Sequence, residues 1–349
     1  MIRVLIADDS ALMRKLLTKI IQTDPDMVIV GAARDGNDVV EKARQLQPDI
    51  VTMDVNMPGQ DGITALQYIV NEKICPVIMV SSLTQEGAIT TFEALELGAF
   101  DFVPKPGGTV SSNMDSVSTE LLAKIKAAVQ SKSRRRKGDS GPIKNKPLVT
   151  PKPSARSTKP MKAVAMGIST GGPKVIYEVL PVLPPEINAA LFLVQHMPAN
   201  FTTTYVKRLN DNCRLEVVEA QAGMKVEKGI IYVGSGGRHL NLAKNAAGDV
   251  LIRLPSKPDH LFIPSVSIMM RSVLQVYGAQ TVGVIMTGMG SDGADTLLEV
   301  RQAGGMTIAE SEESAIVFGM PGEAIKLGGA EVVAPIWNIA REIMRAVNK

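Results

Sequence analysis

Ala163-Val-Ala-Met166-Gly167-Ile-Ser169-Thr-Gly171-Gly172-Pro173 is the stretch that decides the fold of the second half of this chain. Its first four residues are apolar, as in a buried strand, and Pro173 suits the first turn of a helix. Between them a Gly-x-Ser-x-Gly turn, built from small residues, permits the sharp bend that exposes a serine hydroxyl at a strand end. The stretch therefore predicts a strand, a turn with a presented serine, and a helix.

Similar strand-like runs follow along the chain, and helical patterns come after several of them. Alternation of this kind is typical of an α/β domain with a doubly wound, mostly parallel sheet. We expect such a domain over residues 161–349, with strands at Ala163–Met166, Ala190–Val194, Ile230–Val233, Val250–Arg253 and Val282–Met286.

The first half of the chain alternates in the same way, without a motif shared with the second half. It predicts a separate doubly wound α/β domain over residues 1–130, with strands at Val4–Ala7, Val28–Gly31, Ile50–Met53, Val77–Val80 and Asp101–Val103. Residues 131–160 are rich in Ser, Pro, Lys and Arg and offer little apolar surface, so we expect a basic linker there.

Bulk composition excludes several classes of protein. With 349 residues, 45% hydrophobic and 21% charged, the chain has room for two ordinary globular domains, and no apolar run approaches the roughly 18–20 residues of a membrane span. No secretory signal is apparent, and Cys75 and Cys213 have no zinc-site spacing, so we expect reduced thiols in a cytoplasmic protein without membrane insertion. A net charge of +3 does not by itself indicate nucleic-acid binding.

Partners for Ser169 are expected at other strand ends of the second domain. His196 follows the run Ala190–Gln195 and is the expected base, whereas His239 follows a glycine-rich loop and is a neighbouring substrate or structural residue, and His260 is most simply a loop residue. Asp292 follows the last predicted strand. Taken alone it would be a helix N-cap, but together the strand ends predict a Ser169–His196–Asp292 triad.

Carboxylates also collect at the strand ends of the first domain. Asp8 and Asp9 end the first strand and Asp54 the third, while Ser81 ends the fourth and Lys105 follows the fifth. Three carboxylates at one sheet edge repel one another and raise at least one pKa unless a cation lies among them. Hard oxygen ligands of this kind suit Mg²⁺. In this interpretation Asp54 attacks a phosphoryl group, Lys105 pairs with the product, and the Ser81 hydroxyl reaches a phosphoryl oxygen.

A simpler alternative makes the aspartate pair the N-cap of the helical run from Ala11. The complete set of strand-end residues favours the phosphoryl site.

With these residues, the segment from about Ile2 to Val129 resembles the receiver domains of two-component response regulators, which have a flavodoxin-like fold. The resemblance implies that Asp54 is the phosphoacceptor, with Mg²⁺ held by Asp9, Asp54 and the carbonyl of Asn56, supported by Asp8, and that Phe102 is the aromatic switch residue. Pro104 before Lys105 departs from the commonest pattern.

The second domain resembles the chemotaxis methylesterases of the CheB family. The strings that carry the resemblance are Gly167–Pro173, Gln195-His-Met-Pro198 and Thr287-Gly-Met-Gly-Ser-Asp292, where Ser291 replaces the more usual asparagine. The family implies a phosphorylation-activated enzyme that demethylates glutamyl esters of chemoreceptors and deamidates glutamines. It also implies oxyanion stabilisation at Thr170 and Met289, no cofactor at the serine site, and a chemotaxis histidine kinase as phosphodonor. We expect a monomer.

The sequence argues against two other classes of protein. A DNA-binding response regulator would use the run Arg134-Arg-Arg-Lys137 on phosphates, but no helix-turn-helix with a basic recognition helix follows it. A catalytically dead scaffold would need a damaged triad, and all three residues are present.

Overall fold

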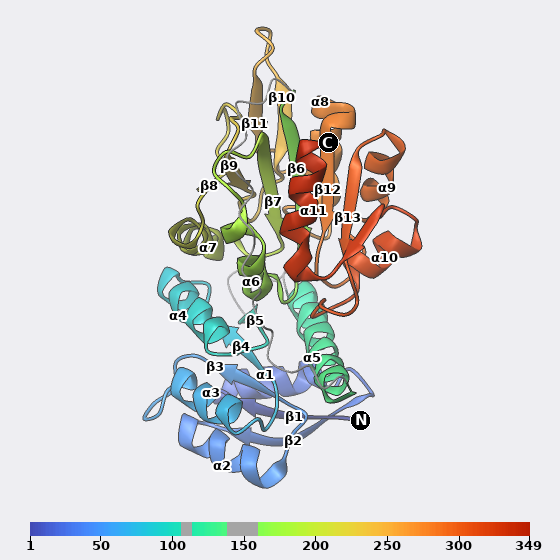
Figure 1. The fold of residues 1–349 in the computed structure, drawn as a ribbon. Coiled ribbons are helices and arrows are strands. Elements are labelled where there is room, and N and C mark those ends of the chain that lie inside the picture. Colours follow the sequence, from blue (N-terminus) through green and yellow to red (C-terminus); the bar gives the residue numbers. More distant parts are fainter. Residues whose placement is uncertain (106–113, 138–159) are drawn as a thin grey trace. The chain divides into compact units, whose positions relative to one another are not determined.

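The computed structural model describes residues 1–105, 114–137 and 160–349. The chain divides into two compact units, Met1–Lys144 and Asn145–Lys349. Each has a parallel sheet of its own (Figure 1), in agreement with the two predicted α/β domains.

The sheet of the first unit is wholly parallel, with strand order β2-β1-β3-β4-β5. Its strands are β1 (Ile2–Ala7), β2 (Met27–Ala33), β3 (Ile50–Asp54), β4 (Val77–Ser81) and β5 (Asp101–Pro104). In the register, Ala7 pairs with Met53, so the residues that follow β1 and end β3 lie at one level. The strand order reverses between β1 and β3, which is where a doubly wound sheet binds its ligands.

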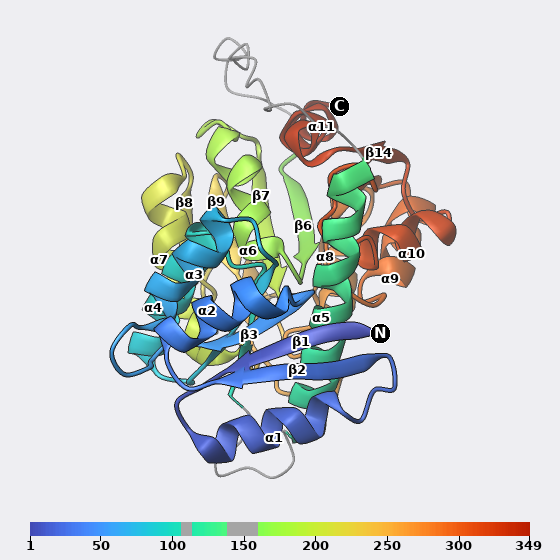
Figure 2. The ribbon, with the colours of Figure 1, turned by 90° about the horizontal axis from the view of Figure 1, so that it is seen from below.

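The helices of this unit are α1 (Ala11–Ile21), α2 (Gly36–Leu46), α3 (Gly62–Asn71), α4 (Gln85–Glu96) and α5 (Met114–Lys137). Figure 2 shows α1 and α2 on opposite sides of β1 and β2. Ser10, rather than Asp8 or Asp9, is the N-cap of α1, because its side chain accepts a hydrogen bond from the Met13 N–H. The simpler interpretation of the aspartate pair as a cap is therefore wrong, and both aspartates remain available for chemistry.

Helix α5 continues past the predicted domain boundary. It ends at Lys137, so the part of the predicted linker from Ser131 to Lys137 is helical. Lysine and arginine are good helix formers, which explains how a basic run prolongs a helix. Residues 138–159 of the predicted linker lie outside the described residues.

The sheet of the second unit has the order β14-β13-β12-β6-β7-β9-β8, and its pairings are parallel. Its strands are β6 (Lys162–Ile168), β7 (Ala189–Gln195), β8 (Glu216–Glu219), β9 (Ile230–Val233), β12 (Thr281–Ile285), β13 (Met306–Glu310) and β14 (Val332–Ala334). The predicted strand Val250–Arg253 is β11, which pairs with β10 (Asn241–Lys244) in an antiparallel hairpin outside this sheet. Because β6 lies between β7 and β12, the turn after β6 stands at the switch point of the sheet.

Helices cover both faces of this sheet. The helices and 3₁₀ turns are α6 (Gly172–Val175), η2 (Ile176–Glu178), η3 (Leu180–Val182), α7 (Ala199–Asn212), α8 (Val266–Tyr277), η4 (Gly278–Gln280), α9 (Ala294–Gln302), α10 (Met320–Lys326) and α11 (Ile336–Asn348). In Figure 1, α11 lies in front of the strands and α8 behind them. Side chains of α8 such as Met269 and Val273 pack with Ala165 and Phe192 of β6 and β7 in one buried core.

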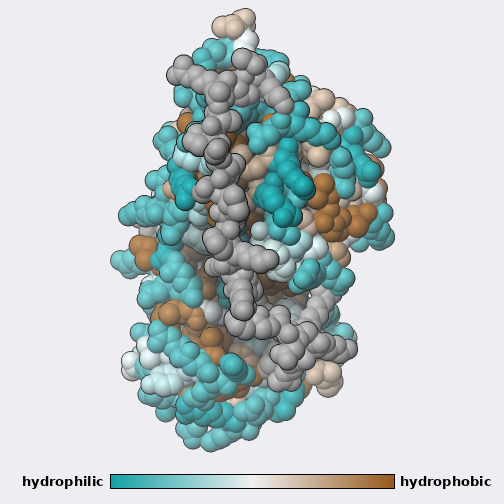
Figure 3. Space-filling view, in the orientation of Figure 1, coloured by the Kyte–Doolittle hydropathy of each residue, from teal (hydrophilic) through white to brown (hydrophobic). Residues whose placement is uncertain are grey.

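The visible surface is mostly hydrophilic, with small separate hydrophobic patches (Figure 3). Within the described residues, no helix is long and apolar enough to span a bilayer.

Candidate active site

Ser169 is held at the end of β6 by backbone contacts on both sides. Its N–H donates to the carbonyl of Thr287 at 2.9 Å, and its own carbonyl accepts from Gly172 N at 2.8 Å and Gln195 Nε2 at 3.0 Å. Gly171 has φ +77°, a left-handed conformation that glycine adopts without strain. These contacts fix the backbone of the turn and use both backbone polar groups of Ser169, so its hydroxyl is the group that remains available for chemistry.

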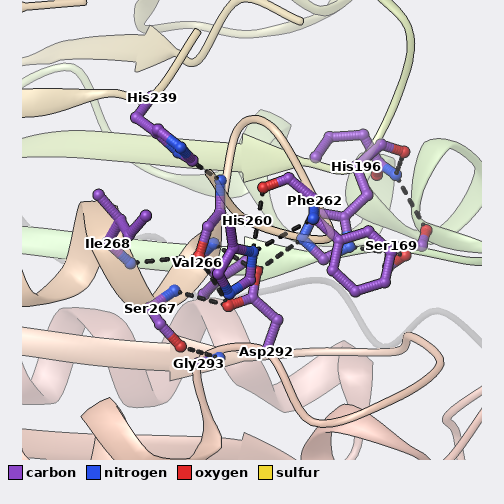
Figure 4. A network of polar contacts seen from close by, with 12 residues as sticks. Ser169, His196, His239, His260, Phe262, Val266, Ser267, Ile268, Asp292 and Gly293 are labelled. Carbon is purple, nitrogen blue, oxygen red and sulfur yellow. Dashed lines mark hydrogen bonds and ion pairs between the residues drawn. The ribbon is translucent and has the colours of Figure 1, made fainter. Parts of the chain in front are cut away.

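His196 follows β7 and joins Ser169 to Asp292 (Figure 4). Its Nδ1 lies 3.1 Å from Ser169 Oγ and its Nε2 lies 2.9 Å from Asp292 Oδ2. An ionised carboxylate only accepts hydrogen bonds, so the ring proton is on Nε2, and the lone pair of Nδ1 faces the serine. In the common serine-protease arrangement, Nε2 faces the serine and Nδ1 faces the aspartate. Here the two nitrogens are exchanged, but one still faces the serine hydroxyl and the other still faces the carboxylate.

Asp292 is anchored by the first turn of α8. Its Oδ1 accepts from Ser265 Oγ at 2.9 Å and Ser267 N at 3.0 Å, and its Oδ2 accepts from Val266 N at 2.6 Å. Burial raises the pKa of Asp292, but the hydrogen bonds from His196 and from these backbone N–H groups outweigh it and hold the pKa well below its usual range. The carboxylate is therefore ionised and aimed at His196.

Phe262 covers one face of the His196 ring. The two rings are stacked with centroids 4.2 Å apart and planes 7° from parallel. The Phe262 N–H donates to Nδ1 of His260 at 3.2 Å. His260 is exposed and belongs to a loop, and the loop position is the one predicted. Stacking limits the rotation of His196 and adds apolar surface beside its ring.

His239 is fully buried and outside the Ser169–His196–Asp292 chain. Its Nδ1 lies 3.2 Å from the Ser265 N–H, and its Nε2 lies 2.9 Å from the carbonyl of Pro258. An N–H donates to the first nitrogen and a carbonyl faces the second, so His239 is neutral with its proton on Nε2. Of the two roles predicted for it, the structural one fits these contacts.

The segment after β12 closes over Ser169. A Cβ on Gly288 would lie 2.8 Å from Ser169 Cβ and 2.3 Å from Met320 Sδ, so only glycine fits this approach. Thr170, a predicted oxyanion residue, is buried beside Ser169, and Met289, the other one, follows Gly288 and is half-buried. Thr170 therefore neighbours Ser169 in the chain, and Met289 follows the glycine that approaches Ser169. The oxyanion role of both residues stays a prediction.

The first unit gathers its predicted phosphoryl site at the carboxyl end of its sheet. Lys105 Nζ lies 3.0 Å from Asp8 Oδ2 and 2.8 Å from Asp54 Oδ2. Burial raises the pKa of Asp54, and the nearby charge of Asp8 adds to this, although Lys105 opposes it. For Lys105, burial lowers the pKa, but the two carboxylates outweigh it and raise the pKa overall. The lysine is a cation held between two acids.

The donor set of this pocket fits a divalent metal. Oxygen atoms of Asp8, Asp9 and Asp54 all lie within 4.8 Å of one another. Three carboxylates at this spacing suit a hard cation such as Mg²⁺. Asn56, the predicted carbonyl ligand, follows β3 and is exposed at the same edge.

The predicted switch residues are close to this pocket, but their side chains contact other groups. Ser81 Oγ donates to the Gly87 carbonyl at 3.2 Å, while the Lys105 N–H donates to the Ser81 carbonyl at 2.8 Å. Phe102 is buried edge-on against Phe92, with ring centroids 6.3 Å apart. The predicted reach of Ser81 to a phosphoryl oxygen would require its hydroxyl to leave Gly87.

Sequence reasoning missed several residues that build the serine site. Ser265 precedes an apolar helical pattern, so the N-cap preference would have found its place but not its contact with Asp292. Phe262 and Thr287 gave no such signal, because their contacts depend on which segments meet in space.

Comparisons with known proteins agree with both units. A family model described as "CheB methylesterase" matches residues 164–343, and one described as "Response regulator receiver domain" matches residues 4–111. A Syntrophomonas wolfei protein named "Protein-glutamate methylesterase/protein-glutamine glutaminase 3" is 70% identical over 357 aligned residues, which cover 100% of both chains. A Caldanaerobacter subterraneus protein named "Protein-glutamate methylesterase/protein-glutamine glutaminase" is 45% identical, with 100% of this chain and 97% of that protein covered.

Among solved structures, the Thermotoga maritima CheB methylesterase catalytic domain matches with a TM-score of 0.52 and 35% identity, covering 53% of this chain and 98% of that one. The chain therefore belongs to the CheB methylesterase family and carries a response regulator receiver domain ahead of its methylesterase domain.

Proposed function

We propose that this chain hydrolyses methyl esters of glutamate side chains on chemoreceptors, and also deamidates receptor glutamines, with Ser169 as nucleophile, His196 as base and Asp292 as the residue that orients His196. The observation that carries the proposal is the chain of hydrogen bonds from Ser169 Oγ through His196 to Asp292, at 3.1 and 2.9 Å. The family of the chain and the names of its relatives supply the substrate class.

In the first half of the reaction, Ser169 Oγ bonds to the ester carbonyl carbon while its proton passes to His196 Nδ1. Asp292 stabilises the imidazolium that forms. The negative charge on the carbonyl oxygen is met by the backbone N–H groups of Thr170 and Met289, and one such donor is worth about 10²–10³ in kcat in a comparable hydrolase. The carbon–oxygen bond to the methoxy group then breaks, and His196 returns the proton to release methanol.

In the second half, water attacks the acyl carbon and gives its proton to His196. The bond to Ser169 breaks, the serine regains a proton, and the glutamate side chain leaves as a carboxylate. With a glutamine substrate the same steps release ammonia in place of methanol.

The receiver domain regulates this activity through Asp54. An Asp54 oxygen bonds to phosphorus as the bond to the phosphodonor breaks, and Lys105 pairs with the acyl phosphate. Asp8, Asp9, Asp54 and the Asn56 carbonyl would hold Mg²⁺, which when bound supplies positive charge against the phosphoryl oxygens. Phosphorylation by a chemotaxis kinase then shifts the enzyme toward its more active state, and Ser81 and Phe102 take part in this switch. We expect the enzyme to act as a monomer.

The test is methanol release from methylated chemoreceptor membranes, with and without acetyl phosphate and Mg²⁺. We expect wild type to be stimulated by the phosphodonor, Asp54→Ala to keep only the unstimulated rate, and Ser169→Ala to release no methanol under either condition.

Ser272→Ala is the matched control for the serine variant. Ser272 is buried on α8 and bonds to the backbone of Leu242, away from His196 and Asp292. Methanol release by Ser169→Ala at the wild-type rate would exclude the triad, and equal stimulation of wild type and Asp54→Ala would exclude control through Asp54.

A further inference from the structure

Glu310 is a buried acid that has no part in the mechanism above. It is the last residue of β13 and is fully buried. Its Oε2 accepts the Thr287 N–H at 2.7 Å, and its Oε1 accepts the Ser314 hydroxyl at 2.7 Å. Within the described residues, Glu310 forms no ion pair, so both of its partners are neutral.

A carboxyl group in this environment is costly to keep charged. Burial raises the pKa of Glu310 to about 7, and the charge of Glu178 on η2 adds to the rise, while the Ser314 and Thr287 contacts oppose it. Apolar residues usually occupy such interior positions, because an unpaired buried charge destabilises the fold. The contacts of Glu310 should therefore serve something other than packing.

The partner of Glu310 is the residue that holds the nucleophile turn. The Thr287 carbonyl accepts the Ser169 N–H at 2.9 Å, and Thr287 Oγ1 donates to the Thr170 carbonyl at 3.0 Å. The same Oγ1 accepts the Val317 N–H at 2.9 Å. Thr287 is thus bonded to both residues of the turn that carry the chemistry, and Glu310 is bonded to Thr287.

We propose that Glu310 is a positioning residue of the esterase site: through Thr287 it fixes the backbone of Ser169 and Thr170, and with it the segment that leads to Met289. The proposal rests on the proposed function, because it takes Ser169 as the nucleophile. Within the described residues, Glu310 forms no hydrogen bond with His196 or Asp292. It therefore acts on Ser169 and Thr170 and not on the other two members of the triad.

Removal of the Glu310 side chain leaves the Thr287 N–H buried without an acceptor. Such a group regains a partner by moving, and a movement of Thr287 displaces the N–H and carbonyl groups bonded to it. Misplacement of the nucleophile and of the oxyanion donors lowers kcat. KM should change little, because Thr287 is fully buried and does not line the substrate surface.

Three variants separate positioning from packing and from charge. Glu310→Gln keeps an oxygen for the Thr287 N–H, and its amide N–H can donate to Ser314 after the hydroxyl rotates. Glu310→Ala removes the acceptor, and Glu310→Leu removes it while filling the space. We expect kcat to fall about tenfold in the Ala and Leu variants, less than for loss of an oxyanion donor itself, and to stay within about threefold of wild type in Gln.

The experiment measures kcat and KM for methanol release by the full chain, with active sites counted by a serine-directed fluorophosphonate. Rates per counted site correct for any variant that folds poorly. Glu342→Gln is the control, since Glu342 is a buried acid on α11 whose partners are Arg341 and Arg345.

A fall in kcat per site for Ala and Leu, with KM unchanged and with rescue by Gln, supports the proposal. Wild-type kcat per site in Ala and Leu, or an equal loss in Gln and Ala, overturns it. Ser169→Ala in the same assay distinguishes failure of the proposed function from failure of the role of Glu310. Activity in Ser169→Ala refutes the proposed function itself. An inactive Ser169→Ala together with fully active Glu310 variants refutes only the role of Glu310.

Discussion

The two units place acids at the same position, the carboxyl end of a parallel sheet, but they compensate the negative charge in different ways. In the receiver domain, Asp8 and Asp54 share the cation of Lys105, and burial with mutual repulsion raises the pKa of Asp54. In the methylesterase domain, Asp292 receives its hydrogen bonds from His196 and from the first turn of α8, and its pKa is lowered. Backbone N–H groups do not lose their protons and so favour an ionised acid, whereas a pocket of acids around one lysine remains able to accept another cation.

The largest effect is expected from the aspartate of the methylesterase domain. Asp292→Asn keeps an oxygen for the Ser267 N–H and the Ser265 hydroxyl, but its amide nitrogen takes the place of Oδ2, where it donates to His196 and leaves the Val266 N–H without its acceptor. The ring then carries its proton on Nδ1, facing Ser169, and no longer accepts the serine proton. In a serine protease with a Ser-His-Asp triad the equivalent change lowers kcat about 10⁴-fold, and we expect a similar loss in methanol release here.

Thermal unfolding of Asp292→Asn supplies the control, because a retained melting temperature shows that α8 is still capped. A variant with more than a tenth of wild-type kcat would mean that the charge of Asp292 is not what orients His196, and the contrast between the two units would lose its basis.

A smaller effect should come from Glu310, which tests whether the number of donors decides the direction of a pKa shift. Glu310 has two donors where Asp292 has four, and its pKa is raised to about 7. A raised pKa in the folded state stabilises the protein at low pH, and this contribution is lost as the pH rises from about 4.5 through about 7. The free energy of unfolding should fall by up to ~3 kcal/mol over that interval in wild type, and this component should be absent in Glu310→Gln.

Trp337, the single tryptophan of the chain, lies on α11 and makes this measurement specific to the methylesterase domain. Denaturant unfolding followed by its fluorescence at several pH values gives the two curves to be compared. Equal pH dependence in wild type and Glu310→Gln would show that Glu310 titrates in the folded state as it does in the unfolded chain.

The smallest expected effect concerns Mg²⁺ in the receiver domain. A cation at 100 times its dissociation constant stabilises the unit that binds it by about 2.7 kcal/mol. Calorimetry with Mg²⁺ or with a chelator should show this increase for the receiver transition of wild type and not of Asp54→Asn. A shift of the Trp337 transition by Mg²⁺, or an undiminished shift of the receiver transition in Asp54→Asn, would contradict the assignment of the metal to the acid pocket.

Much of this architecture follows from the sequence because strand ends can be located in it. Ser169, His196 and Asp292 each follow a predicted apolar run, and parallel strands bring such positions to one edge. The strand that ends in Glu310 was missed, since Met306-Thr-Ile-Ala-Glu310 is short and has a polar end, and so was the polar edge strand Glu216–Glu219. Tertiary context also sets what no pattern encodes, such as which nitrogen of His196 faces Ser169.

The anchoring of Asp292 makes one carboxylate both the proposed orienter of His196 and the acceptor for the first N–H groups of α8. Under the proposed mechanism, local fraying of that helix end interrupts catalysis in the same event that exposes the amides of Val266 and Ser267 to solvent. Amide hydrogen exchange at these two positions should consequently measure the fraction of time for which the resting enzyme is disarmed, without any substrate being present.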